Sequence, residues 1–341
     1  MNRPQEMISD RRVNHRCRVC DSPELVELGE YQAYLDYKTE VLLCRKCSCR
    51  QTVRDGAVYD QLHRQSDSSY GWHTDLANKV YYAFSKSQID TIEQALAQTP
   101  KYRFIMDTLR NLAPNSKVLE IGCSQGYLLA WFILRGFDAK GVDVSDSAVR
   151  AANRYFGPHF STPQDFGDSH TNQFDAIFHV GTVGCVDSPT QWIETLLDWV
   201  KPGGLVLFNA PNVDACRYTG ELWLESTKPP DLVTLFSPEL WEPRFKHLAD
   251  VQVLLRLADP KEAAWLRWRR IKRKLGLQFR PRAYLARVAR RGVTSRIASH
   301  VEAFAIRALS RFTIIERVAR ISKIPSEYGT FVILRKKLSP V

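Results

Sequence analysis

The stretch Lys117-Val-Leu-Glu-Ile-Gly-Cys-Ser-Gln-Gly-Tyr-Leu-Leu-Ala130 decides the fold of this chain. Its first residues are mostly apolar and suit a buried parallel strand. Gly122 and Gly126 then bracket a tight turn, and residues 127–131 begin a helix. A strand that runs through a glycine turn into a helix brings backbone N–H groups close to a bound ligand.

A second apolar stretch ends in Gly141-Val142-Asp143, 17 residues after Gly126. An acid at the tip of the second strand is placed to accept hydrogen bonds from ribose hydroxyls. The two stretches together predict a nucleoside-binding site at the carboxyl edge of an open sheet. The spacing Glu120-x-Gly122-x-Ser124-x-Gly126 does not fit the dinucleotide fingerprint G-x-G-x-x-G.

This spacing resembles motif I of the class I S-adenosylmethionine-dependent methyltransferases, an acid-x-Gly-x-Gly-x-Gly, with Ser124 where the middle glycine is usual. The resemblance covers roughly residues 100–256 and the last strand. Residues 174–180 and 200–208 look like the fourth and fifth strands of that family. The Ala210-Pro211-Asn212 that follows is seen in the subgroup that includes quinone and sugar methyltransferases.

The resemblance implies an α/β, Rossmann-like sheet of seven strands that binds S-adenosylmethionine. Glu120 would orient the methionyl amine, Asp143 would bind the ribose, and Asp165 and Phe166 would contact the adenine ring. The expected cofactor-binding residues are Glu120, Gly122, Cys123, Ser124, Gly126, Asp143, Val144, Asp165, Phe166 and His179. The alternative is an ordinary strand-to-helix turn without a ligand.

Four of the eight cysteines form two knuckles, Cys17-x-x-Cys20 and Cys44-x-x-Cys47, with 23 residues between them. Each knuckle can present two thiolates to one tetrahedral ion, so we expect a structural zinc ribbon with no open position for water. The interval is slightly longer than is usual, and Cys49 is an alternative fourth ligand. The remaining cysteines are scattered and suit small buried positions.

The composition sets outer limits. A chain of 341 residues with 44% hydrophobic content suffices for one α/β domain with appendages. It has no run of 18 apolar residues and no signal-peptide pattern, so we expect no transmembrane segment and a cytoplasmic location.

Changes in pattern along the chain suggest its organisation. Residues 57–100 contain aromatic clusters that either cover the cofactor as a lid or pack the segment onto the domain. Apolar residues at 250–256 and 328–335 predict the two last strands, which the family pairs as a hairpin. We expect a zinc-ribbon domain at 1–56, a helical linker or lid at 57–100, the methyltransferase core at 101–256, a basic helical insertion at 257–325 and the final strand at 326–341.

The insertion holds the basic charge of the protein. Residues 261–296 carry 13 Lys or Arg and one acid, a net charge of +12, whereas the whole chain has +11. Apolar residues at helical spacing predict amphipathic helices. The basic face is solvated on a packed helix, or it docks on an anionic membrane from the cytoplasmic side, or it binds nucleic acid. An acidic partner protein or a phosphorylated substrate is a further alternative.

Methyl transfer from a sulfonium requires an aligned nucleophile and, where needed, a base. His179, at the tip of the fourth strand, is the first candidate for this base, and His73 on the lid segment is the second. The alternative is that His179 only frames the cofactor pocket. In the subgroup, the stretch that begins at Pro230 often carries two histidines, but this chain has Leu232 and Thr234. Asn212, Trp223 and Glu225 are candidates for shaping the acceptor pocket.

Three functions fit these observations. The leading one is a small-molecule methyltransferase for a sugar or a cell-surface glycan precursor, with O-methylation preferred and C-methylation as an option. The second is an RNA methyltransferase that uses the ribbon and the basic insertion, although RNA-module features are missing. The third is a non-catalytic scaffold of the same fold.

Overall fold

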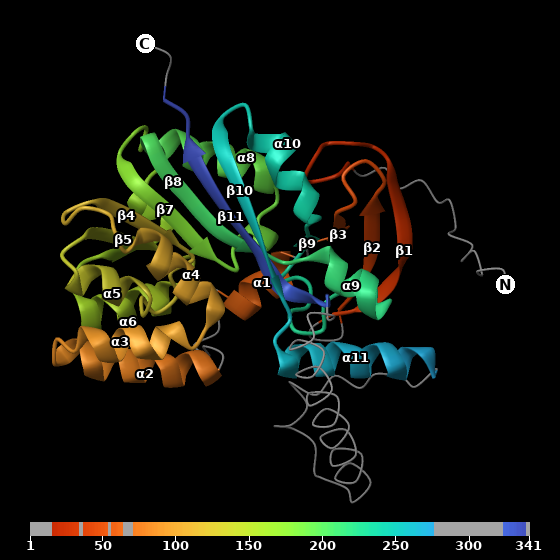
Figure 1. The fold of residues 1–341 in the computed structure, drawn as a ribbon, viewed down its shortest axis with the longest axis horizontal. Helices are drawn as coiled ribbons and strands as arrows, with labels where there is room; N and C mark the ends of the chain where they lie inside the picture. The colour runs from red at the N-terminus through yellow and green to blue at the C-terminus, as the bar shows by residue number, and fades with distance from the viewer. Residues whose placement is uncertain (1–15, 34–36, 54–55, 64–70, 276–322, 339–341) are drawn as a thin grey trace, which may run out of the picture.

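The computed structural model describes residues 16–33, 37–53, 56–63, 71–275 and 323–338. Two sheets organise the chain (Figure 1). The smaller sheet has the order β1-β2-β3-β9 and the larger has the order β10-β11-β8-β7-β4-β5-β6. The predicted seven-stranded Rossmann-like sheet is therefore confirmed.

The large sheet is parallel in its centre and antiparallel at one side. Strands β4 to β8 pair in parallel, and β11 pairs antiparallel with both β8 and β10. Its strands are β4 (Lys117–Ile121), β5 (Asp138–Val142), β6 (Phe160–Ser161), β7 (Phe174–Val180), β8 (Val200–Ala210), β10 (Ala249–Leu257) and β11 (Pro325–Lys336). Going along the chain, the sheet first grows from β4 outward to β6 and then returns to β7 on the other side. The carboxyl ends of β4 and β7 thus flank the switch point where α/β sheets bind ligands.

Helices cover both faces of the large sheet because its strands are apolar on both sides. One face packs on α4 (Pro100–Leu109), α5 (Leu129–Leu134) and α6 (Asp146–Phe156), with α2 (Gly71–Ser85) and α3 (Ile89–Ala97) outside them. The other face packs on α8 (Pro189–Trp199) and α10 (Trp241–Phe245). Successive side chains of a strand point to opposite faces of the sheet, so Phe178 of β7 packs in the first core and its neighbour Ile177 packs in the second.

The segment expected as a lid or a packed segment contains three helices, α1 (Gly56–His63), α2 and α3. Tyr81 of α2 stacks on Tyr155 of α6 with ring centroids 3.8 Å apart, and its hydroxyl donates to Gln125. Phe84 packs edge-on against Phe156. These two aromatics therefore fasten α2 to the outside of the domain, whereas Tyr59 of α1 lines the large cavity described below.

The small sheet combines distant parts of the chain. β1 (Leu25–Gln32), β2 (Lys38–Cys44) and β3 (Arg50–Thr52) form a meander, and β3 then pairs with β9 (Thr234–Leu235). The amide of Thr52 also donates to the carbonyl of Val233 over 3.0 Å. The cysteine-bearing module is thus joined edge to edge to a segment that follows the large sheet's strand β8 in the chain.

The predicted hairpin between the two last strands is present, with Val253 opposite Val332 in its centre. At the connected end of the hairpin, the last residue of β10, Leu257, pairs with the first residue of β11, Pro325. The chain between these two residues contains α11 (Pro260–Lys274). Figure 1 shows α11 beyond the lower end of the sheet. Predictions for residues 276–322 of the insertion lie outside the described residues. Among the helices that are described, none combines the length and the apolarity needed to cross a membrane.

Candidate functional site

The turn after β4 has the backbone that a close ligand approach requires. Gly122, Ser124 and Gly126 all have positive φ, at 76°, 48° and 75°. A Cβ on Gly122 would lie 2.4 Å from the Thr182 hydroxyl oxygen. Ser124 adopts the left-handed conformation although it has a side chain, and its backbone N–H donates to the Asp143 carboxylate over 2.7 Å. That bond offsets the strain that glycine would avoid.

Asp143 and Glu120 lie at the tips of neighbouring strands. Asp143 follows β5, and its carboxylate also accepts from the backbone N–H of Ser145 over 2.9 Å. Glu120, on β4, is 4% exposed, and one of its carboxylate oxygens has no hydrogen-bond partner among the described residues. Burial, and then the charge of Asp143, raise the pKa of Glu120 well above its ordinary value. A cation beside Glu120 would therefore be stabilised.

These residues line a cavity of about 1030 Å³, at the upper end of the range of ligand pockets. Its wall includes seven of the ten residues expected to bind the cofactor, and α7 (Pro163–Phe166) contributes one of them, Phe166. The expected residues on the wall are Glu120, Gly122, Cys123, Ser124, Asp143, Val144 and Phe166.

Three expected cofactor residues do not line the cavity. Gly126 instead supports the turn, since a Cβ there would lie 2.5 Å from the Phe160 ring. Asp165 accepts a hydrogen bond from the Thr162 hydroxyl over 2.7 Å at the start of α7. Neither residue is therefore placed to contact a ligand in the cavity.

His179 is the third of these residues, and the structure does not support its expected role as base or cofactor contact. It is fully buried, with its ring stacked on Phe208 at 4.9 Å and packed against Trp192 at 4.8 Å. Burial lowers the pKa of His179 to about 3, and neither ring nitrogen has a hydrogen-bond partner among the described residues. The alternating side-chain direction of β7 turns His179 toward α8 and away from the cavity. The side chain of His73, the second candidate, lies outside the described residues.

The opposite wall of the cavity is polar, and the sequence reasoning missed it. Ser226, Thr227 and Asp231 come from the segment between α9 (Val213–Thr219) and β9, and Tyr328 comes from β11. The Tyr328 hydroxyl donates to the hydroxyl of Thr227. The sequence signal for this wall is Asp231, the acid that follows Pro230.

The residues expected to shape the acceptor pocket lie elsewhere. Asn212 caps α9 by accepting from the backbone N–H of Asp214, and Trp223 is 1% exposed within an apolar cluster. Glu225 lies in an ion cluster around Arg269. None of the three lines the cavity, so their effect on a ligand there is indirect.

Lys101 adds a basic group to the cavity wall. It lies in the first turn of α4, and burial lowers its pKa to about 8. Nearby, the hydroxyls of Tyr102 and Tyr127 are 2.9 Å apart. The cavity thus presents one amine and several hydroxyls close to the buried Glu120.

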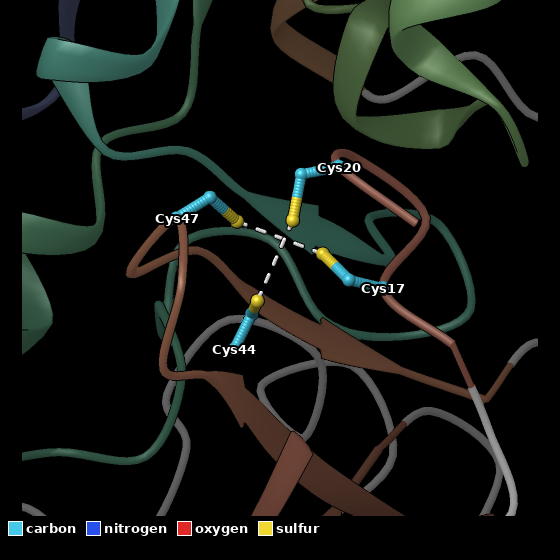
Figure 2. Close-up of side chains that lie close together, drawn as sticks. All are labelled: Cys17, Cys20, Cys44 and Cys47. Carbon is cyan, nitrogen blue, oxygen red and sulfur yellow. Dashed lines mark hydrogen bonds between the residues drawn. The ribbon is translucent and has the colours of Figure 1, made fainter. Parts of the chain in front are cut away.

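The four knuckle cysteines meet at one point. Their sulfur atoms all lie within 4.8 Å of one another, and Figure 2 shows them pointing toward a common centre. The Cys17–Cys47 and Cys20–Cys44 sulfur pairs are each 3.6 Å apart. Four sulfurs at about 2.3 Å from a tetrahedral zinc are separated by about 3.8 Å, so the spacing fits such an ion. The Cys49 thiol accepts from the backbone N–H of Ser237 instead.

An ion cluster lies behind the polar wall. Arg269 of α11 is 2% exposed and pairs with Glu327 over 2.7 Å and with Glu221 over 2.8 Å. Glu225 is 3.4 Å from the same guanidinium. Glu225 directly precedes Ser226, and Glu327 directly precedes Tyr328. The ion cluster therefore holds both of the chain segments that contribute the polar wall.

Residues 93–291 match the profile of a family described as "Methyltransferase domain". This match spans more than half of the chain, so the chain belongs to that methyltransferase family. The family assignment agrees with the sheet order and with the glycine turn and acid described above.

Curated relatives resemble only part of this chain. A ubiquinone biosynthesis O-methyltransferase from Thiobacillus denitrificans is 28% identical over 120 residues, which are 33% of this chain and 51% of that protein. Phosphoethanolamine N-methyltransferase 1 from Arabidopsis thaliana is 31% identical over 31% of this chain and 22% of its own length. The chain thus spans about half or less of the length of these relatives.

Two solved structures are similar to part of this chain at low sequence identity. A Haemonchus contortus phosphoethanolamine N-methyltransferase 2 in complex with S-adenosyl-L-methionine is 14% identical, with a TM-score of 0.40 over 70% of this chain and 52% of that chain. A complex of the Haloferax volcanii Trm112 methyltransferase activator and a methyltransferase gives a TM-score of 0.43 at 13% identity, over 76% of this chain and 98% of that chain.

Proposed function

We propose that this protein transfers a methyl group from S-adenosylmethionine to a hydroxyl of a sugar or a glycan precursor. The observation that carries the cofactor assignment is the buried carboxylate of Glu120 at the cavity wall, one oxygen of which has no hydrogen-bond partner in the described part of the chain. The ammonium of a methionyl group is a cation of the size and charge that this carboxylate would stabilise. Asp143, at the next strand tip, supplies acceptors for ribose hydroxyls.

The other walls suit the remaining parts of that cofactor. Phe166 and Val144 provide apolar surface for an adenine ring. Lys101 supplies a positive charge for a carboxylate near Glu120. When bound, the cofactor supplies an electrophilic methyl group, and the residues of this chain hold its two ends and exclude water from the space between.

The polar wall supports the proposed acceptor class. Three hydroxyls and one carboxylate, from Ser226, Thr227, Tyr328 and Asp231, line the same cavity in which the cofactor is proposed to bind. Such a wall exchanges hydrogen bonds with a polyhydroxylated molecule, which supports a sugar more than a quinone ring. Transfer to a carbon of the sugar is the alternative within this class.

Calorimetric titration with S-adenosylmethionine tests the cofactor assignment. We expect Asp143→Ala to weaken binding at least tenfold, because the variant loses the ribose acceptor and the partner of the Ser124 amide. Asp146→Ala, which changes an exposed acid three residues away, should bind as the parent does. No binding by the parent at millimolar cofactor would favour a non-catalytic scaffold.

We propose further that the four knuckle cysteines bind a structural zinc ion. The support is the all-thiol donor set and the tetrahedral spacing of its sulfur atoms. Metal analysis under reducing conditions should find one zinc per chain in the parent and in Cys49→Ser, but none in Cys47→Ser. Zinc loss from Cys49→Ser with retention in Cys47→Ser would make Cys49 the fourth ligand.

The basic segment at 261–296 is proposed to dock on an anionic membrane surface. The structure describes only the part of this segment that lies in and just after α11. There Arg270, Arg273 and Lys274 are exposed beside exposed Ile271 and Leu275. This mixture suits a lipid headgroup layer. Vesicles with anionic lipid should retain the protein at low salt, whereas neutral vesicles should not. Stronger, log-linear salt-dependent binding to RNA would favour the nucleic-acid alternative.

A further inference from the structure

Four carboxylates line the described part of the cavity: Glu120, Asp143, Asp168 and Asp231. The first two end β4 and β5, and Asp168 follows α7, so these three belong to the half of the sheet that the proposed cofactor occupies. Asp231 belongs to the polar wall beside β11, two strands beyond β7 in the sheet order. A carboxylate at that end of the cavity lies across the sheet order from the strands that carry Glu120 and Asp143, where an acceptor would bind beside the proposed cofactor.

Contacts fix the position of Asp231 relative to the cofactor turn. The backbone N–H of Val233 donates to the carbonyl of Gly184 over 2.9 Å, in the 3-10 helix η2 (Val183–Cys185). Leu232 packs closely on Gly184, because a Cβ added to Gly184 would lie 2.2 Å from a side-chain carbon of Leu232. Two residues earlier, Thr182 contacts Gly122 and donates to the carbonyl of Ile121 over 3.2 Å. A short series of contacts therefore connects the turn after β4 to the segment that carries Asp231.

The small sheet supports the same segment from its other side. The carbonyl of Val233 accepts from Thr52, and β9 begins at the next residue. Asp231 is thus followed by backbone that is held at both edges, by η2 and by β3. This support gives Asp231 the fixed position that proton transfer requires.

Tyr328 lies beside Asp231 and remains a hydrogen-bond donor. Burial raises the pKa of Tyr328 well above its ordinary value, and the charge of Asp231 contributes in the same direction. Its hydroxyl donates to Thr227. A neutral phenol, two aliphatic hydroxyls and a carboxylate at one end of a cavity can orient one hydroxyl of an acceptor toward the carboxylate.

We propose that Asp231 accepts the proton of the acceptor hydroxyl during methyl transfer, and that Tyr328 and Thr227 orient the acceptor. The inference rests on the proposed function. In this step the acceptor O–H bond breaks and its proton passes to the Asp231 carboxylate, while the oxygen forms a bond to the methyl carbon. The carbon–sulfur bond of the sulfonium breaks, and its electron pair remains on the sulfur of the resulting thioether.

The test uses labelled S-adenosylmethionine and a deproteinised small-molecule extract of the organism that encodes the protein. Asp231→Asn should lower the rate of label transfer by about 10²–10⁴-fold, the range of general-base catalysis. Its dissociation constant for S-adenosylmethionine should stay within about twofold of the parent, because Asp231 faces the acceptor. Asp187→Asn, at an exposed acid outside this cavity, is the matched control.

Two further variants separate chemistry from folding. Asp231→Glu keeps a carboxylate and should restore part of the rate, whereas a merely structural role would not favour it over Asn. Tyr328→Phe should raise the KM for the labelled acceptor more than it lowers kcat. Periodate, which cleaves vicinal diols, should destroy the acceptor in the extract if it is a sugar.

The outcomes distinguish this inference from the proposed function. A parent protein that does not bind S-adenosylmethionine overturns the proposed function and the inference with it. An Asp231→Asn variant that binds the cofactor and still transfers label at more than half of the parental rate overturns the inference alone. Label transfer that survives periodate overturns the sugar class of the acceptor.

Discussion

Gly126 and Gly136 show how much one Cβ can change at the scale of a residue. Both have positive φ, at 75° and 79°. A Cβ on Gly126 would lie 2.5 Å from the Phe160 ring, whereas a Cβ on Gly136 would meet no atom within 4 Å. The pair therefore separates backbone strain from steric collision.

We expect Gly136→Ala to lower the free energy of unfolding by about 1–2 kcal/mol, the cost of a left-handed conformation for a residue with a Cβ. Gly126→Ala should cost about 1–3 kcal/mol more, because the ring of Phe160 must move. It should also weaken S-adenosylmethionine binding, since the cofactor turn shifts. Urea unfolding and calorimetry check these values. Equal losses in the two variants would show that Phe160 moves freely.

Sequence spacing predicted which residues line the cavity better than it predicted the surroundings of His179. Glu120 and Asp143 follow from their places at two strand ends, which local patterns reveal. His179 also lies at a strand end, but Ile177 and His179 share a face that α8 covers, so the histidine is buried among Phe208 and Trp192. Which face is covered depends on helices that pack from elsewhere, and no local pattern contains that information.

At the scale of elements, Arg269 joins α11 to the polar wall. Its guanidinium is buried between Glu221, Glu225 and Glu327 and lies 4.3 Å from the centre of the Trp265 ring. The charge count along 261–296 identifies a basic segment. It did not show that one of these cations turns inward, because a helix face becomes buried only through its partner.

Arg269→Met should lower the free energy of unfolding by about 3–5 kcal/mol, because it leaves buried carboxylates without their cation. It should also raise the KM for the acceptor, since the cluster holds the segments that carry Ser226 and Tyr328. Arg270→Met, at the next and exposed position, should change stability by about 1 kcal/mol or less. Similar losses in the two variants would contradict the role given to the cluster.

The same cluster predicts a pH dependence. Burial raises the pKa of Glu225 from 4.5 to about 7, with Arg269 acting in the opposite direction. The folded protein then holds a proton that the unfolded chain releases. This contribution to stability is complete below pH 4.5 and is lost as the pH rises to about 7. Its size is on the order of 1–3 kcal/mol.

Glu225→Gln should therefore reduce the fall in unfolding free energy between about pH 5 and pH 7, measured by urea titration at each pH. The glutamine keeps the shape of the side chain but has no proton to lose. An unchanged slope in the variant would assign the titration to another group.

At the scale of the whole molecule, the cysteine module and the catalytic domain share one sheet. The cysteine spacing predicted the metal cluster as a hypothesis, and the structure brings the four sulfurs together. No local pattern predicted that β3 would pair with β9, because that pairing spans a long interval of sequence and involves only two residues on β9. The boundary expected at residue 56 stays a prediction, although the sheet itself crosses it.

Chelation should release zinc and loosen more than the module. We expect faster amide exchange at Thr52 and Val233, where β3 meets the segment after Asp231, and unchanged exchange at Leu119 in the centre of the large sheet. Turnover should fall further than cofactor affinity. Hydrogen exchange followed by mass spectrometry, before and after chelation, checks this result. Protection that persists at Thr52 would show that the metal does not support the acceptor side.

The pairing of Leu257 with Pro325 has a consequence for deleting the segment between them. Because the two ends of this segment are paired with each other in the hairpin, a short link could replace everything between them without breaking the strand pairing. Arg269 sets the limit of such a deletion, because its removal leaves Glu221, Glu225 and Glu327 without their cation.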